Sequence, residues 1–481
     1  MDLPNSSIQQ LKTKINENTS FLDELGESVS HRSSKVQEKY NAFISFDPQL
    51  IADEIDVIKN KVHSSKNLSL LGVPFALGDN ISTSEQKTTC ASKILSAYQP
   101  PFDARVTSIL KEKGAIVAGK TNMNEFGVGC SGDSSFFKAV KNPWDTKNTA
   151  GNGAAAAVLT GAVKLSLASD AVGELRQAAS YCGVMALKPT YGRISRRGLL
   201  DYASSLEQIG IISNNTRDLA AAMEALFGYD QEDVSTLDAE VPAYTLMLDN
   251  TSSKIQAALP EDWSDAPFLQ DDIKILFQEQ IGKLQDLGIK IDLITLPHFR
   301  YASTAAAIIS AVEAFSNLAN YDGIRFGYRG EAKHLQEMYT QTRSEGFSSK
   351  LKKFLTFGSL ISTANYYNDY FLQSQKMRSV ITNELDTCLQ KYDLILTPTT
   401  PFTATSLDHN STFNGNLPDP ACYYTAAANL TGLPALTFPV NGAGLPFGLQ
   451  FMGKRENEVE LLKTALLLEQ ELSFQKPEFE I

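Results

Sequence analysis

The feature that most constrains the fold is the alternation of short apolar segments with longer amphipathic ones between Leu70 and Ser213. Asp103–Lys113 has helical spacing, and Ala115–Ala118 after it has the length of a buried strand. Ala154–Thr160 repeats the helical pattern, and Ala162–Leu167 follows as the next apolar strand. Alternation of this kind predicts an α/β core, with helices packed on a twisted sheet.

The flanking regions extend this prediction. Residues 1–65 are polar with helical periodicity, which predicts a helical N-terminal wrap that packs as one compact unit on an α/β domain over residues 66–481. The acidic stretch 230–272 predicts an irregular surface excursion, and residues 300–390 are rich in helical patterns. A helix and further strands are expected at Ile273–Leu287, Ile289–Leu293, Tyr392–Pro398, Leu436–Val440 and Leu449–Met452.

Charge and cysteine usage exclude several classes of protein. A net charge of −12 argues against this chain gripping a nucleic-acid backbone directly. The five cysteines are scattered without a C-x-x-C pair, and the histidines lack H-E-x-x-H spacing, so we expect neither a metal nor a cofactor. The longest small-apolar run, Ala154–Val163, is too short to span a membrane, and the first residues have no apolar leader. We therefore expect a cytoplasmic protein.

A glycine-rich segment, Gly151-Asn-Gly153, opens a helix and resembles a phosphate loop at first sight. A phosphate loop needs Lys-Ser/Thr after its last glycine, but alanines follow here. Ala156 also occupies the place of the third glycine in a dinucleotide-binding loop. The segment does not predict nucleotide binding.

A series of ordered blocks resembles the amidase-signature family, and most of all the A subunits of its tRNA-dependent amidotransferases. The resemblance implies a mixed twisted sheet covered by helices on both faces, and assembly with B-like and C-like subunits. The blocks are Leu71-GVPF, Asp79-NIST, Gly114-AIVAGKTNMNEF, Lys141-NPWD, Leu187-KPTYGRISRRG, Ala203-SSLEQIG, Ser316-NLANYDGIRFGYR, Asp393-LILTPTTP, Asn429-LTGLPALTFPV and Gly444-LPFGLQFMGK.

The family chemistry uses a Ser-Ser-Lys triad, in which a lysine base and a relay serine activate a serine nucleophile. This sequence departs from the family at each of those positions. Gly78 stands at the lysine position, Ala150 at the relay serine and Glu174 at the nucleophile. Gly173, Arg176 and Gln177 remain from the nucleophile loop, and we expect them to bind and hold that loop.

The substrate positions implied by the resemblance also differ. Two tyrosines of the A subunits map to Ala306 and Ala307, and an aspartate that recognises the amino group of glutamine maps to Cys422. An Arg-Arg pair maps near Lys353–Phe354. These replacements predict a pocket that has lost the groups that recognise glutamine.

Three hypotheses for function follow. The first is a non-catalytic paralogue, a scaffold or regulatory subunit that binds B-like and C-like partners but does not release ammonia from glutamine. The second is an active A subunit of a glutamine-dependent Glu-tRNA(Gln) amidotransferase, or an amidase, that uses a non-family mechanism through Glu174 or Cys130. The third is a binding module for a small amide or carboxylate ligand. We adopt the first as the main prediction.

The loop that would carry the family nucleophile, here the loop before Glu174, gives a further expectation. Loops of this kind aim backbone N–H groups at a developing oxyanion. A carboxylate placed beside such donors is expected to fold back and accept them, so Glu174 should lie within about 3.2 Å of at least one loop nitrogen.

Overall fold

The computed structural model describes residues 6–62, 68–129, 131–249, 254–408, 417–442, 444–479 and 481. One mixed sheet in the order β1-β3-β2-β4-β6-β5-β10-β11-β9-β7-β8 runs through the centre. The predicted α/β fold with a mixed sheet is confirmed. The strands are β1 Phe43–Ser45, β2 Pro74–Gly78, β3 Ile116–Thr121, β4 Leu165–Asp170, β5 Met185–Lys188, β6 Gln208–Ser213, β7 Gln256–Pro260, β8 Lys290–Ile294, β9 Leu394–Pro398, β10 Ala435–Val440 and β11 Phe447–Gly453.

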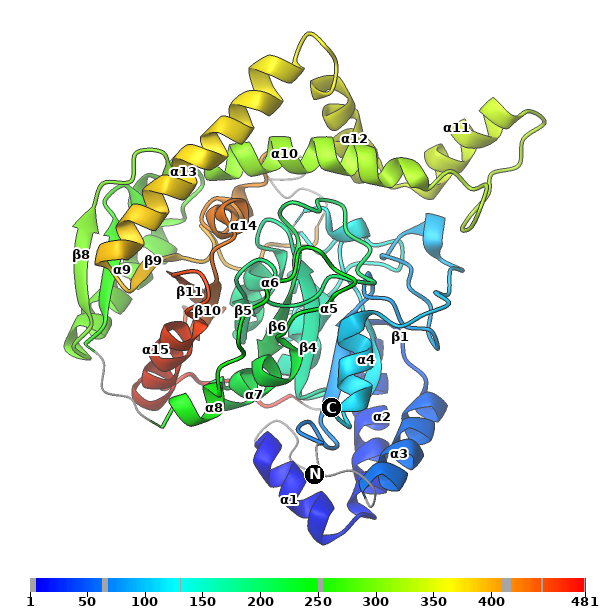
Figure 1. Cartoon of the computed structure of the whole chain (residues 1–481), viewed down its shortest axis with the longest axis horizontal. Helices are drawn as coiled ribbons and strands as arrows, with labels where there is room; N and C mark the ends of the chain where they lie inside the picture. Colours follow the sequence, from blue (N-terminus) through cyan, green and yellow to red (C-terminus); the bar gives the residue numbers. More distant parts are fainter. Residues whose placement is uncertain are drawn as a thin grey trace.

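Helices pack around this sheet on both faces and above one end of it (Figure 1). Because side chains alternate along a strand, Phe75 and Leu77 of β2 enter one core while Ala76 enters the other. The helices are α1 Ile8–Glu17, α2 Phe21–Tyr40, α3 Pro48–Val62, α4 Arg105–Glu112, α5 Gly153–Leu159, α6 Glu174–Cys182, α7 Thr216–Leu226, α8 Tyr244–Met247, α9 Asp271–Asp286, α10 Ala302–Asn317, α11 Leu335–Gly346, α12 Ser349–Ile361, α13 Leu372–Lys391, α14 Ala426–Thr431 and α15 Glu458–Glu471.

The N-terminal helices share a core with the sheet. Ile51, Ile55 and Ile58 of α3 are buried in the same cluster as Ile116 and Ala118 of β3. This confirms the helical periodicity expected in residues 1–65 for this helix. The domain boundary expected at residue 65 lies outside the described residues.

One expectation for the middle of the chain is wrong. The acidic stretch 230–272 contributes β7, whose residues Ala257–Pro260 are buried between β9 and β8. The strand escaped notice because its apolar run is short and lies within an acidic region, whereas its partners come from residues far along the chain.

A lobe of long helices covers the end of the sheet where β4 finishes (Figure 1). Its centre is α10, which packs against α12, α13 and α14. By length and apolar content, Phe299–Asn320 is the one segment of the described chain that could cross a membrane, but half of its most apolar window is buried within the protein. Five of its alanines belong to the core of the lobe: Ala302, Ala305, Ala306, Ala311 and Ala314.

The sheet topology brings the positions mapped from the family together. The parallel neighbours β2 and β4 are in register, with Leu77 opposite Leu167. Parallel strands place their carboxyl ends at the same edge of a sheet. Gly78 at the end of β2 therefore lies near the loop that links β4 to Glu174 at the start of α6.

Candidate functional site

A small polar cavity lies where these segments meet. Its lining includes Gly78, Gly151 and Glu174, so two of the three mapped positions face it. The third, Ala150, is fully buried beside Gly151. The cavity has a volume of about 20 Å³, which is enough for a single water molecule. Its remaining walls carry several polar side chains, among them Asn80, Asn122, Asn124, Asn152 and Ser169.

The carboxylate of Glu174 is bound by its own loop. Oε2 accepts hydrogen bonds from the backbone nitrogens of Ala171 at 2.8 Å, Val172 at 2.9 Å and Gly173 at 3.2 Å. The expected fold-back contact is present. Gly173 makes it possible, because its φ of 125° belongs to a region that glycine adopts without strain.

This environment sets the acidity of Glu174. Burial raises its pKa to about 7, and the negative charge of Asp170 acts in the same direction, while the loop hydrogen bonds oppose both. A carboxyl group with a pKa near 7 can exchange a proton at neutral pH, as a general base must.

Tyr202 contacts the other oxygen of the same carboxylate. Its hydroxyl donates to Oε1 of Glu174 at 2.9 Å, and burial holds the pKa of the phenol well above its usual value. Glu207 lies close by and accepts from the backbone nitrogen of Tyr202 at 2.9 Å. Burial raises the pKa of Glu207 well above its ordinary value, and the negative charges of Asp201 and Glu174 act in the same direction. The sequence did not single out either residue, although both lie in or beside the block that begins at Ala203.

Arg176 holds the base of the loop and does not face the cavity. It forms two hydrogen bonds to Asp170, at 2.9 and 3.1 Å, and a third at 2.6 Å to Gln450. The Arg176 guanidinium lowers the pKa of Asp170 despite complete burial. Gln177 reaches the loop through Thr425: its Nε2 donates to Oγ1 of Thr425 at 3.1 Å, and this hydroxyl donates to the carbonyl oxygen of Val172 at 2.8 Å.

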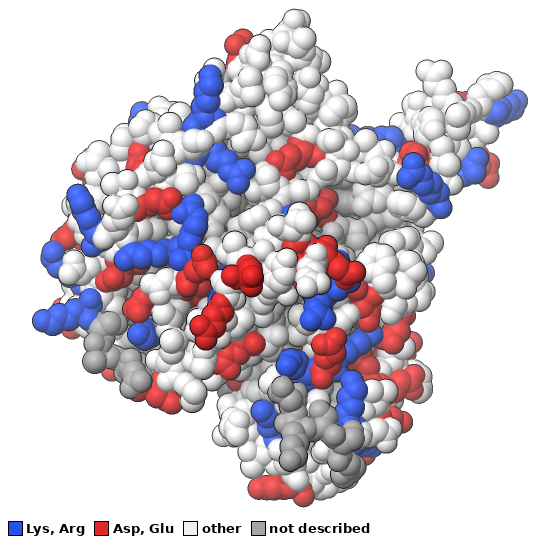
Figure 2. Space-filling view, viewed as in Figure 1, with Lys and Arg blue, Asp and Glu red and all other residues white. Residues whose placement is uncertain are grey.

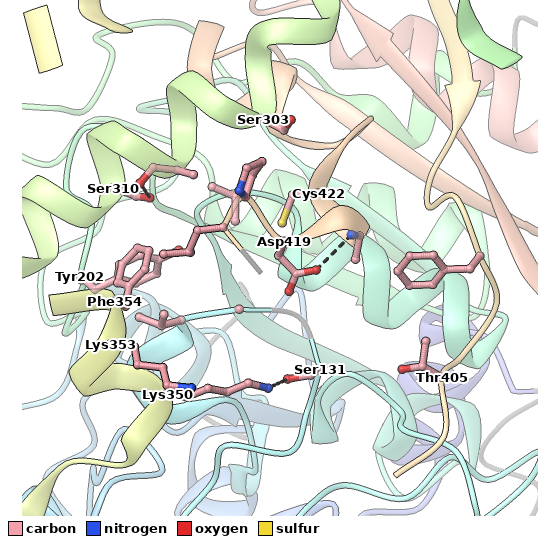
Figure 3. Close-up of a pocket in the computed structure, with 18 of the residues that line it drawn as sticks. Ser131, Tyr202, Ser303, Ser310, Lys350, Lys353, Phe354, Thr405, Asp419 and Cys422 are labelled. Atoms are coloured by element: carbon pink, nitrogen blue, oxygen red, sulfur yellow. Dashed lines mark hydrogen bonds between the residues drawn. The ribbon is translucent and has the colours of Figure 1, made fainter. Parts of the chain in front are cut away.

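A second, larger cavity lies beside the first, between the loop and α12 (Figure 3). Its volume is about 110 Å³. Most of its wall is apolar and is formed by Val128, Val172, Phe354, Phe402, Pro418 and Ala421. Gly129 lines both cavities, so the two meet at this residue.

The residues mapped from the substrate pocket divide in the structure. Ala307, Cys422, Lys353 and Phe354 line the larger cavity. Ala306 faces the core of the helical lobe and is fully buried there. Cys130 lies outside the described residues.

Charged groups that the sequence did not indicate also line this cavity. Lys350 and Asp419 are among them, and Lys350 donates to Ser131 Oγ at 2.8 Å and pairs with Asp133 at 2.7 Å. The signal for Asp419 in the sequence is its position, because it lies three residues, or one helical turn, before the mapped residue Cys422. Within the described residues, no three His, Cys, Asp or Glu side chains gather as a metal site would need.

Comparisons with known proteins place this geometry in context. A family model described as amidase matches residues 24–462. The glutamyl-tRNA(Gln) amidotransferase A subunit of Halothermothrix orenii is 38% identical over 98% of both chains, and that of Persephonella marina is 37% identical over 97% of both. The crystal structure of the Thermotoga maritima glutamyl-tRNA(Gln) amidotransferase A subunit is 31% identical and superposes with a TM-score of 0.81 over 100% of this chain and 99% of that one. A 6-aminohexanoate cyclic dimer hydrolase at 20% identity shares the fold, with a TM-score of 0.84 over 98% of both chains.

These relatives correct the main prediction for function. They are named as subunits of an enzyme and match this chain almost from end to end, so the expectation of a non-catalytic scaffold is wrong. The prediction considered only the residues missing at the mapped positions and not the carboxyl group that stands in place of the serine. Burial raises the pKa of this group, Glu174, to about 7. By its match to the family model and by its full-length relatives, the chain belongs to the amidase family.

Proposed function

We propose that this chain is the A subunit of a glutamine-dependent Glu-tRNA(Gln) amidotransferase, and that Glu174 replaces the serine-based triad in releasing ammonia from the amide donor. The observation that carries the first part is the similarity to named A subunits over 98% of both chains. The loop-bound carboxylate with a pKa of about 7 supports the second part.

In the proposed reaction, Glu174 acts as a general base towards one water molecule in the small cavity. The carboxylate takes a proton from the water, and the water oxygen attacks the amide carbon of the donor. The carbonyl electrons move to oxygen, and when they return the carbon–nitrogen bond breaks. Glu174 gives its proton to the departing nitrogen, so that glutamine and water yield glutamate and ammonia.

Two neighbouring groups support this role. Tyr202 fixes one carboxylate oxygen, which orients the base. Asn152 is the candidate donor to the oxyanion, because it lines the small cavity and its Nδ2 has only a long 3.4 Å contact to the carbonyl oxygen of Glu174. A positioned donor of this kind is worth about 10²-fold or more in rate.

The proposal includes assembly with B-like and C-like subunits in the cytoplasm, with the tRNA held mainly by those partners. In Figure 2, lysines and arginines on the visible face are interspersed with acidic residues, and the chain has a net charge of −12. Strong binding to nucleic-acid phosphates needs lysines and arginines clustered on one surface. The mixed charges of this face and the negative net charge do not favour such a cluster.

The test is an assay of the chain purified together with B and C subunits. We expect ammonia release from glutamine and formation of Gln-tRNA(Gln). Glu174→Gln should lower ammonia release by about 10²-fold or more, because an amide cannot accept the proton. The matched control is Glu279→Gln on the exposed face of α9, which should retain full activity. A wild-type assembly without ammonia release, or a Glu174→Gln assembly with full activity, would refute the proposal.

A further inference from the structure

The small cavity contains a hydrogen-bond acceptor that the protein does not satisfy. Asn80 is fully buried and lines the cavity, and its Oδ1 has no hydrogen-bond partner within the described residues. A Cβ on Gly78 would lie 3.2 Å from this oxygen. The unpartnered oxygen therefore stands directly in front of the position where the family has its lysine. A buried acceptor without a donor is unfavourable, so this oxygen points to a ligand that donates.

The contacts of the other atom of the amide fix the orientation of Asn80. Its Nδ2 donates to Oγ of Ser169 at 2.9 Å, and lies 3.4 Å from Oε1 of Glu207 and 3.5 Å from the carbonyl oxygen of Leu200. Because a backbone carbonyl can only accept, the nitrogen belongs on this side of the amide. The oxygen of Asn80 is left to the cavity.

Two other amides of the wall have already used their donors. Nδ2 of Asn122 donates to the carbonyl oxygens of Asn41 at 3.1 Å and Lys138 at 3.0 Å. Nδ2 of Asn124 donates to the carbonyl oxygen of Gly129 at 2.5 Å. The wall therefore has few hydrogens left to offer, and a ligand that carries only donors suits it better than one that must also accept.

The charge near the cavity is negative. Glu174 lines it, and the partners of its carboxylate are neutral donors, namely the loop nitrogens and the hydroxyl of Tyr202. The other ionisable groups around this carboxylate are Glu207 and Asp170, and Asp170 is already paired with Arg176. Among the described residues that line the cavity, none is a lysine or an arginine. A cation would balance the ionised form of Glu174.

Size and chemistry narrow the choice of cation. The cavity volume of about 20 Å³ accommodates one species of the size of a water molecule. Ammonium has this size, carries only donors, and presents the same group as the lysine side chain that is absent at Gly78. We propose that the small cavity is an ammonium-binding site, in which Oδ1 of Asn80 and the carboxylate of Glu174 accept hydrogen bonds from the ion in front of Gly78.

The site has a consequence for the reaction, and this part of the inference rests on the proposed function. Ammonia released from the amide donor takes up a proton at neutral pH and becomes the ligand. The ion then occupies the place of the attacking water and binds the carboxylate of Glu174. Ammonium should therefore inhibit ammonia release, whereas its binding to the chain does not require turnover.

The experiment follows thermal unfolding of the full-length chain at about pH 8, above the pKa of Glu174. The chain is titrated with ammonium chloride, potassium chloride or tetramethylammonium chloride at constant ionic strength. Because a ligand of the folded state stabilises it, Tm should rise by about 1 °C or more for each tenfold increase in ammonium above its dissociation constant. Tetramethylammonium is too large for the cavity, and potassium should give a smaller rise than ammonium.

Two variants assign the response to the cavity. Gly78→Lys fills the site with a tethered ammonium group, and Glu174→Gln removes the negative charge, so each should lose the rise specific to ammonium. The matched controls are Gly282→Lys, where nothing lies within 4 Å of the added Cβ, and Glu279→Gln on the exposed face of α9. Both controls should respond to ammonium as the wild type does.

Three results would overturn the inference: no rise with ammonium in the wild type, an equal rise with potassium, or a rise that survives in Glu174→Gln. The last of these applies even if Gly78→Lys does not fold. Ammonia release is measured separately on the wild-type assembly with B and C subunits. Turnover without specific stabilisation by ammonium would refute only the ammonium site, and stabilisation without turnover would refute only the proposed function.

Discussion

The hydroxyl of Tyr202 donates a 2.9 Å hydrogen bond to Oε1 of Glu174, a residue 28 positions earlier in the chain. The contact joins the loop after β4 to the segment that precedes β6, two strands that are antiparallel neighbours. The second oxygen, Oε2, accepts hydrogen bonds from three backbone nitrogens of the loop, so both oxygens of the carboxylate are held in place.

Removal of this hydroxyl should change the pH dependence of the reaction. Tyr202→Phe keeps the ring against the larger cavity but loses a hydrogen bond that favours the ionised carboxylate, so the pKa of Glu174 should rise. We expect the ascending limb of the pH profile of kcat to move to higher pH, kcat at neutral pH to fall about tenfold, and KM to change little.

The control for this variant is Tyr191→Phe, which removes a hydroxyl bound to the carbonyl of Ser204 at 2.8 Å. Its pH profile should match that of the wild type. An unshifted profile for Tyr202→Phe would show that the phenol does not act on Glu174.

The acidity of Glu174 also predicts how stability depends on pH. Burial raises its pKa from 4.5 to about 7, so between these pH values the folded protein holds a proton that the unfolded chain has released. This contribution to stability is therefore present at low pH and is lost as pH rises through that window. At about 1.4 kcal/mol per tenfold change in proton affinity, the loss is at most about 3 kcal/mol.

Glu174→Gln cannot ionise and should escape this loss. We expect the variant to gain in Tm relative to the wild type between about pH 5 and pH 8, as followed by thermal unfolding at both values. Glu279→Gln, on the exposed face of α9, is the matched carboxyl-to-amide control. A Glu174→Gln difference that does not grow with pH would contradict the raised pKa.

The buried ion pair beneath the loop should be important for stability. Arg176 and Asp170 are both fully buried, with Nε of Arg176 2.9 Å from Oδ2 of Asp170. Arg176→Met leaves that carboxylate without its cation, and breaking one partner of such a pair costs about 3–5 kcal/mol. Urea unfolding should report a loss of this size.

An exposed arginine provides the comparison. Arg217 pairs with Asp249 at 3.0 Å, with both side chains more than half exposed, so Arg217→Met should change the free energy of unfolding by less than about 1 kcal/mol. Equal losses for the two variants would mean that burial does not set the strength of the inner pair.

The glycine of the loop offers a test of close packing. A Cβ on Gly173 would lie 2.0 Å from Oγ1 and 2.3 Å from Cβ of Thr425, at a φ of +125°. Gly173→Ala must therefore move the loop, and we expect several kcal/mol of destabilisation together with loss of ammonia release.

Gly288→Ala separates the clash from the backbone strain. Gly288 has a φ of +85°, but nothing lies within 4 Å of its added Cβ. The free energy of unfolding of this variant should therefore fall by only about 1–2 kcal/mol. Similar unfolding free energies for the two variants would show that the contact with Thr425 is not limiting.

The sequence by itself determined the fold class and much of its order. Spacing of apolar residues indicated helices in residues 1–65 and located α9, and the strand pattern located β9 to β11, because local periodicity depends on which face of an element is buried. The ordered family blocks mapped Gly78, Ala150 and Glu174 to the three triad positions. The structure brings Gly78 and Glu174 together because β2 and β4 are parallel neighbours with their carboxyl ends at one edge.

Only the tertiary structure decided what these residues do together. The pairing of Tyr202 with Glu174, and the position of Asp419 beside Gly129, depend on loops packed from distant parts of the chain. The pKa of Glu174 depends likewise on burial and on the direction of three backbone N–H groups. The sequence shows that position 174 holds a glutamate where the family has a serine. The pKa of this glutamate is set by the atoms that surround it in the folded protein.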